Sequence, residues 1–149
     1  MNLFTVSKSP PTLALKQLRE LKIPENEVIK ITSKGRRFSL RFKRALWELN
    51  AHHCCYCGAL IDTHKSMHVD HLHPRSGGGT SKLTNLVCAC ARCNTVKGEN
   101  DIEHLRVALA LSSSAISGVI NVSQARELMS KGVSLPITLD LFHFERSCA

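Results

Sequence analysis

The sequence predicts a small α+β domain in which helices flank a cysteine-rich centre. Its 149 residues are enough for one modest hydrophobic core. Helix-type apolar spacing occurs on both sides of the centre, and short apolar or alternating runs near residues 28–31 and 138–145 are typical of strands. We therefore expect a basic helical extension at residues 1–50, a core at residues 51–104, and a helical and strand extension at residues 105–149 that packs on the core.

The first fifty residues contain two predicted helices with an ambiguous stretch between them. Thr12 can cap a helix whose apolar residues continue to Leu21, ahead of Pro24. Residues 25–35 are this ambiguous stretch, because their apolar residues fit a short strand as well as a helix. The second helix is expected from Arg37 to Leu49, because its residues repeat at helical spacing. Its apolar face comprises Phe38, Phe42, Ala45, Leu46 and Leu49, and its other face carries a basic stripe of Arg37, Arg41 and Arg44.

Positive charge is concentrated in this first third. The chain has 20 Lys and Arg against 12 Asp and Glu, for a net charge of +8. Such a charge indicates a polyanionic partner, either nucleic acid or an acidic membrane face. No run approaches the roughly 18 to 20 apolar residues that a membrane-spanning helix needs, so we expect a cytoplasmic protein that binds no membrane. A basic stripe is also common on an ordinary solvated face.

The last third is predicted to contain two helices and a strand. Residues Asp101 to Leu111 have helical apolar spacing, and Ser123 can cap a short helix that reaches Met129 and stops before Gly132. The stretch 138–145 alternates apolar with polar residues closely enough to predict a strand. Its buried side would comprise Leu139, Leu141, Phe142 and Phe144.

Two C-x-x-C pairs predict a structural metal site. Cys54 with Cys57 and Cys90 with Cys93 have the spacing that lets two sulfurs reach one tetrahedral zinc. The 32 residues between the pairs exceed those of a simple zinc ribbon, so the reactive residues should be sought there. A redox pair and plain buried thiols are the competing interpretations. Nearby residues that could replace one of these four ligands are Cys55, Cys88, His52 and His53. Cys88 suits the core better, and Cys148 is expected to be a spare thiol.

The residues between and just after the pairs resemble a known family. Asp70-His71 is followed by Pro74, a run of three glycines and Asn85-Leu86-Val87, and Asn94 follows the second pair. This order, with Lys97 three residues after Asn94, resembles the HNH endonucleases in their zinc-braced form, which have the ββα-metal (His-Me finger) fold. The resemblance covers about residues 54–97. It implies a first strand at 66–71, a second strand at 86–89 and a helix that opens at Asn94.

The chemistry of these residues suits phosphodiester hydrolysis. Asp70 and Asn94 offer hard oxygen ligands for one Mg²⁺ or Mn²⁺ ion. His71 is the candidate general base, because an ordinary imidazole is largely neutral at pH 7. In the family that the chain resembles, the middle asparagine, here Asn85, holds the loop after the catalytic histidine. Arg75 and Lys97 are expected to contact phosphate, together with the basic stripe.

The sequence thus predicts a metal-dependent DNA endonuclease. The alternatives are a non-catalytic zinc-knuckle module that binds nucleic acid, and a toxin that cleaves RNA. The triplet of Asp70, His71 and Asn94 argues against the binding module, which has no use for it. RNA stays open because phosphate contacts ignore the sugar unless a 2′-OH is recognised. With no large recognition domain in the sequence, we expect weak intrinsic specificity or a targeting protein partner.

Overall fold

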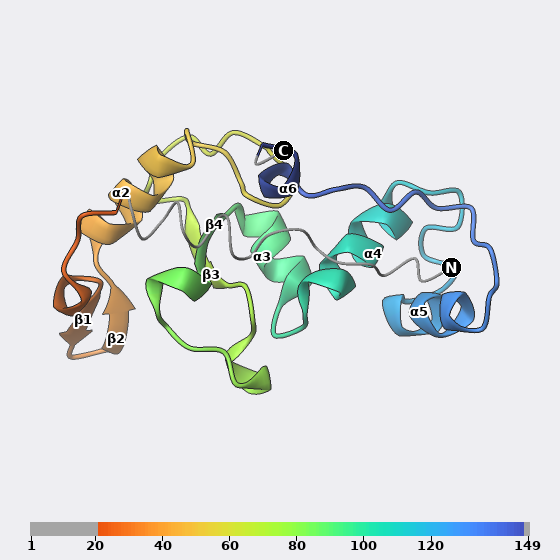
Figure 1. Cartoon of the computed structure of the whole chain (residues 1–149), viewed down its shortest axis with the longest axis horizontal. Coiled ribbons are helices and arrows are strands. Elements are labelled where there is room, and N and C mark those ends of the chain that lie inside the picture. The colour runs from red at the N-terminus through yellow and green to blue at the C-terminus, as the bar shows by residue number, and fades with distance from the viewer. Residues whose placement is uncertain (1–20, 148–149) are drawn as a thin grey trace.

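The computed structural model describes residues 21–147 and confirms the predicted α+β class. It contains two antiparallel sheets of two strands each, β1-β2 and β3-β4, together with helices. Figure 1 shows the first sheet at one end of the molecule, the second sheet near the middle and helix α5 at the other end. Within the described residues, no helix is long and apolar enough to cross a membrane. The helix expected after Thr12, up to residue 20, and the thiol of Cys148 lie outside the described residues.

A β-hairpin replaces the start of the second predicted helix. Strand β1 (Ile29–Thr32) pairs with β2 (Gly35–Phe38), so the ambiguous stretch is a strand and Arg37 lies on β2. Gly35 has a φ of 99°, a left-handed conformation that suits the tight turn. Helix α2 (Leu40–Leu49) begins only after Ser39, whose hydroxyl accepts a hydrogen bond from the Phe42 N–H at 3.1 Å. The expectation that the helix begins at Arg37 was therefore wrong, because Arg37 pairs with Lys30 of β1.

The main hydrophobic core joins all three parts of the chain. Phe42 and Leu46 of α2 are fully buried, as the predicted apolar face requires. They pack in one cluster with Val28 before the hairpin, with the middle of the chain, and with Phe142 and Phe144 near the C-terminal end. The two extensions therefore contribute directly to the core that surrounds the cysteines.

The centre of the fold is a strand, strand and helix unit. Strand β3 (His68–His71) pairs with β4 (Leu86–Ala89), and every residue of β4 is buried. The second strand has its predicted bounds, whereas the first begins two residues later than expected. A loop that contains two 3₁₀ turns, η2 (Arg75–Gly77) and η3 (Leu83–Asn85), connects the strands.

Helix α3 (Ala91–Lys97) begins earlier than the resemblance implied. The Cys90 sulfur caps it by accepting a hydrogen bond from the Cys93 N–H at 3.4 Å. Asn94 was expected to open this helix, but it lies in the middle because the cap is provided by the second cysteine pair itself. Asn94 thereby lies one turn after Cys90 and directly follows Cys93.

Two further helices form a smaller core. Helix α4 (Ile102–Ser112) begins after Asp101, which caps it, and helix α5 (Val122–Ser130) begins after Asn121. Asn121 and Gln124 form a capping box, so the cap is not Ser123 as predicted. The buried side chains that join the two helices are Val107, Leu111 and Ala125.

The prediction of a strand at residues 138–145 is wrong. The chain there is irregular up to α6 (His143–Ser147). The backbone N–H groups of His143 and Phe144 donate to the carbonyl oxygens of Tyr56 and Cys55, each at 2.9 Å, so this segment is bound to the first cysteine pair and not to a sheet. Leu141, expected on the buried side, is 59% exposed.

Candidate active site

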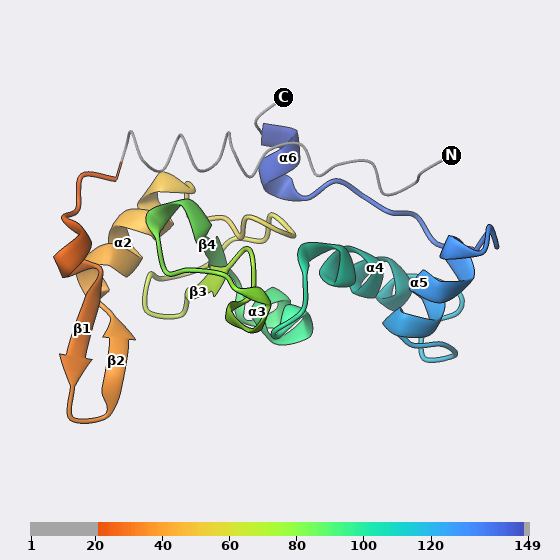
Figure 2. The ribbon, with the colours of Figure 1, turned by 60° about the horizontal axis from the view of Figure 1, so that its bottom comes forward.

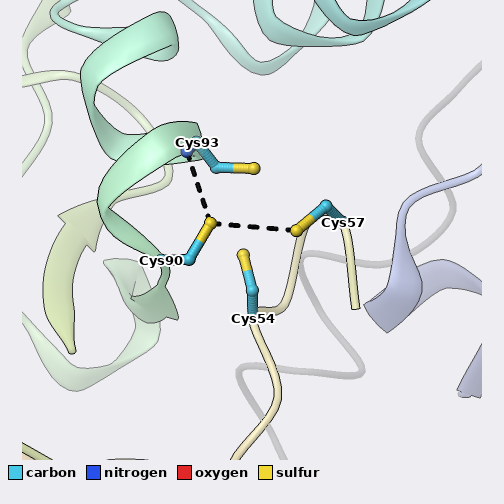
Figure 3. A group of neighbouring side chains, drawn as sticks. All are labelled: Cys54, Cys57, Cys90 and Cys93. Atoms are coloured by element: carbon cyan, nitrogen blue, oxygen red, sulfur yellow. Dashed lines mark hydrogen bonds between the residues drawn. The ribbon is translucent and has the colours of Figure 1, made fainter. Parts of the chain in front are cut away.

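The four predicted zinc ligands converge on one point. The Sγ atoms of Cys54, Cys57, Cys90 and Cys93 all lie within 4.8 Å of one another, and Figure 3 shows them turned inward. The Cys57 and Cys90 sulfurs are 3.8 Å apart. Tetrahedral zinc with bonds of about 2.3 Å places its sulfur ligands about 3.8 Å from each other. The donor set therefore fits a zinc ion.

The other cysteines near this group have a packing role. Cys55 and Cys88 are buried in the main core and do not belong to the described metal-binding group, nor do His52 and His53. Burial raises the pKa of Cys88 to about 12 and that of Cys55 well above its usual range. Within the described residues, the Sγ atoms that gather into one group are those of the two C-x-x-C pairs.

Asp70 lies at the centre of a buried hydrogen-bonded network. The Tyr56 hydroxyl donates to Asp70 Oδ2 at 2.6 Å, and Lys97 Nζ lies 3.1 Å from the same oxygen. Burial raises the pKa of Tyr56 well above its usual range, so this phenol stays protonated and donates. Both contacts fix the carboxylate on one side of β3.

Lys97 points inward, which argues against the predicted phosphate contact. It extends from the last turn of α3 and is 0% exposed. Its ammonium also donates to the backbone carbonyl oxygen of His71 at 2.8 Å. A buried ammonium needs such partners, because an unpaired charge in a protein interior is strongly unfavourable. Lys97 thus connects α3 to both Asp70 and His71.

His71 ends β3 and faces a small cleft. Its Nε2 lies 3.0 Å from the hydroxyl of Ser81, and its ring centroid lies 6.2 Å from that of Phe38. Burial lowers the pKa of His71 below its usual range, and the positive charges of Arg75 and Lys97 act in the same direction, against the opposing effect of Asp70. The imidazole is therefore neutral at pH 7 and able to accept a proton.

Asn85 ties together the two ends of the loop that follows His71. Its Oδ1 accepts from the His73 N–H at 2.8 Å. Its Nδ2 donates to the carbonyl oxygens of His73 at 3.0 Å and of Thr80 at 2.7 Å. This residue is buried and its amide is fully engaged with backbone, which suits an orienting role and leaves it no part in bond cleavage.

Asn94 meets His68 on the opposite side of β3 from His71. The Asn94 Nδ2 lies 3.3 Å from His68 Nδ1. His68 and Asp70 are two residues apart on β3, so their side chains share a face of the strand. The contact with His68 thus brings Asn94 to the side of β3 that carries Asp70. Carboxylate and amide oxygens are the ligands that hard divalent cations prefer, so these two residues could hold one.

Arginines from two parts of the chain surround His71. Arg36 and Arg37 of β2 line the cleft together with Arg75 and Ser81, and its volume is about 120 Å³. Ser81 was missed by the sequence analysis, because only the loop after η2 brings it to His71. By contrast, Arg41 and Arg44 are exposed on α2 and form ion pairs with Glu27 and Glu48. The structure therefore separates the predicted basic stripe into two groups.

Four clustered cysteines brace a unit of two strands and a helix, and Asp70 and His71 lie on its first strand. This is the class of site that the resemblance implies. Residues 54–100 match the model of the HNH endonuclease family, so the predicted resemblance is confirmed over this segment. Lys97 and Asn94 lie inside the matched segment, whereas the hairpin and helices α2, α5 and α6 lie outside it.

The chain is also similar to a nuclease of known name. It is 39% identical over 75 residues to the CRISPR-associated endonuclease Cas9 of Corynebacterium diphtheriae. The matched region covers 50% of this chain and 6% of that relative, so the chain corresponds to a small part of a much longer protein. No solved structure matches the chain significantly. Together these comparisons support a nuclease.

Proposed function

We propose that the protein is a metal-dependent endonuclease that hydrolyses phosphodiester bonds in DNA. The observation that carries the proposal is the position of His71, whose imidazole opens into an arginine-lined cleft. Asp70 precedes His71 on β3, and Asn94 contacts His68 of the same strand. A neutral base, anionic and neutral oxygen ligands and phosphate-binding cations are the groups that hydrolysis of a phosphodiester requires.

In this proposal His71 acts as the general base. Its ring nitrogen accepts a proton from a water molecule, whose oxygen forms a bond to phosphorus as the bond to the 3′ oxygen breaks. The leaving oxygen then takes up a proton. Lys97 holds the backbone of His71 and Asn85 holds the loop after it, so the ring keeps its position while it transfers the proton.

Asp70 and Asn94 would hold one Mg²⁺ or Mn²⁺ ion. The network of Tyr56 and Lys97 occupies Asp70 Oδ2 and thereby leaves Oδ1 for the ion. When bound, such an ion stabilises the charge that develops on the phosphate and on the leaving oxygen. Asn94 contributes a neutral ligand through its amide oxygen, once the amide is turned away from its contact with His68.

Arg37 and Arg75 are the proposed contacts to the scissile phosphate. Both line the cleft at His71, and a guanidinium can bind phosphate oxygens through two parallel hydrogen bonds. Arg41 and Arg44 stay in the proposal only as a more distant source of attraction, because each already forms an ion pair. Lys97 is reassigned from phosphate binding to holding Asp70 and His71 in place.

The proposal is tested by incubating the zinc-loaded protein with supercoiled plasmid and, separately, with ribosomal RNA in Mg²⁺ or Mn²⁺. Nicked or linear plasmid from the parent protein, and intact plasmid from His71→Ala, would support it. Binding without cleavage of either nucleic acid would favour the zinc-knuckle binding module. Cleavage of RNA alone would favour the RNA-cleaving toxin.

A further inference from the structure

We propose that the β1-β2 hairpin binds the sugar-phosphate backbone of the substrate strand and leads it to His71. The proposal rests on the endonuclease function above and names a surface outside the matched family segment. Figure 2 shows the hairpin projecting beyond α2 at one end of the molecule. The sequence analysis expected most contacts to nucleic acid on a helix that begins at Arg37, whereas the structure places Arg37 on the hairpin and favours that surface.

A groove separates the hairpin from the chain that enters β3. Its volume is about 700 Å³, and one wall is formed by both hairpin strands and the start of α2. The other wall is formed by residues 65–69, which include His68 beside Asn94. The groove is open to solvent along its length. The charged residues that line it are Lys30, Arg36, Arg37, Lys43 and Lys65.

The cations of the groove are not neutralised. Across the described residues 21–147, every Asp, Glu, Lys or Arg that lines the groove is basic. Over the same range, no ion pair involves Lys30, Arg36, Arg37 or Lys65, whereas Arg41 and Arg44 on α2 are paired with glutamates. Unpaired cations gathered in a groove attract a polyanion more strongly than cations that already have a counter-charge.

The groove and the cleft at His71 share residues of the hairpin. Arg36, Arg37 and Phe38 line both of them. The arginines of β2 therefore border the groove as well as the cleft that contains the general base. A ligand bound by these arginines would be a phosphodiester backbone, because the cleft has the groups to hydrolyse one.

The base of the hairpin is held firmly against the core. Ser39, directly after β2, donates from its hydroxyl to the Glu27 carbonyl oxygen at 2.6 Å and from its N–H to the Val28 carbonyl oxygen at 2.9 Å. Ser39 also caps α2. These bonds hold the two ends of the hairpin together, and Val28 packs in the main core, so the base of the hairpin is attached to the core.

The test measures binding separately from cleavage. Affinity for a short fluorescein-labelled DNA duplex is followed by anisotropy over a series of KCl concentrations, without added Mg²⁺ or Mn²⁺. The parent protein is compared with Arg36→Gln/Arg37→Gln and with Arg126→Gln/Lys131→Gln, which removes two cations from α5. A second groove variant, Lys30→Gln/Lys65→Gln, removes one cation from each wall. Thermal melting establishes that each variant is folded.

We expect both groove variants to bind more weakly and to flatten the plot of log Kd against log salt by about 1 to 2, because each lost phosphate contact removes about 0.9 from its slope. The α5 variant should match the parent. Groove variants with the parental slope, or an α5 variant with the same loss, would overturn the hairpin assignment even if the parent cuts DNA. Normal binding by the parent without cleavage in Mg²⁺ or Mn²⁺ would instead overturn the endonuclease function.

Discussion

Lys97 and Asp70 illustrate how one buried pair can organise an active site. The ammonium of Lys97 is fully buried and contacts both Asp70 Oδ2 and the His71 carbonyl oxygen. It therefore fixes a proposed metal ligand and the proposed general base at the same time. Tyr56 adds a hydrogen bond to the same carboxylate oxygen from the first cysteine pair.

Replacing Lys97 by methionine should weaken both folding and metal binding. The change leaves Asp70 buried without its cation, which costs about 3 to 5 kcal/mol of unfolding free energy for a buried pair. Urea denaturation measures this loss, and the Mg²⁺ concentration that gives half-maximal cleavage should rise. Lys82→Met, at an exposed lysine of the same region, is the matched control and should change neither quantity. Equal stability of the two variants would contradict a structural pair.

The cleavage rate should depend on pH through the neutral form of His71. Burial lowers the pKa of this imidazole below its usual value of about 6.5. A lowered pKa means that the base is already neutral at pH 7, so activity falls only as the pH drops through the lowered value. A bound cation at Asp70 acts in the same direction. Rates measured from pH 5 to 8 should rise with a midpoint below pH 6.5 and then level off, and a midpoint above 7 would contradict this environment.

At the scale of elements, the two cysteine pairs join parts of the chain that are far apart in sequence. One pair lies in a turn after α2 and the other begins α3, so zinc would join these segments. The start of α6 is attached to the same turn through backbone hydrogen bonds. Arg106 of α4 secures it further by binding Glu145 through two hydrogen bonds of 2.8 and 2.9 Å.

Loss of one thiolate should therefore unfold the central unit. Cys93→Ser removes a ligand, and structural zinc contributes on the order of 10 kcal/mol to the folding of small domains. We expect this variant to be insoluble or unfolded and to lack zinc. Cys88→Ala, which changes a buried thiol outside the metal group, should keep one equivalent of zinc by metal analysis. Soluble, active Cys93→Ser protein without zinc would contradict a structural site.

At the scale of the whole molecule, features that depend on residues close together in the sequence could be predicted. Features that depend on packing between distant parts of the chain could not. The paired cysteines lie close in sequence, and the bounds of β4 follow from its short apolar run. Arg37 has helical spacing with Arg41 and Arg44, but pairing with β1 places it on a strand. Phe142 and Phe144 alternate as in a strand, yet both pack against Tyr56.

Lys97 shows the same limit within the candidate site. Its position three residues after Asn94 was evident from the sequence. The inward direction of its side chain depends on the ion pair with Asp70, which is distant in sequence. A lysine is expected at the surface unless it is paired. The arrangement of the extensions likewise depends on the shared core, in which residues of all three predicted parts contribute. The boundaries at residues 50 and 104 stay predictions.

The most direct test of the account is the rate of DNA cleavage as a function of Mn²⁺ concentration for the parent, His71→Ala and Asn94→Ala. If His71 is the base, its loss slows cleavage by about 10² to 10⁴-fold at every metal concentration, because no metal replaces a proton acceptor. Asn94→Ala loses a neutral metal ligand, so high Mn²⁺ should restore part of its rate. Zinc content and DNA binding should be unchanged in both variants. Cleavage by His71→Ala at the parental rate would contradict the assignment of His71 as the general base.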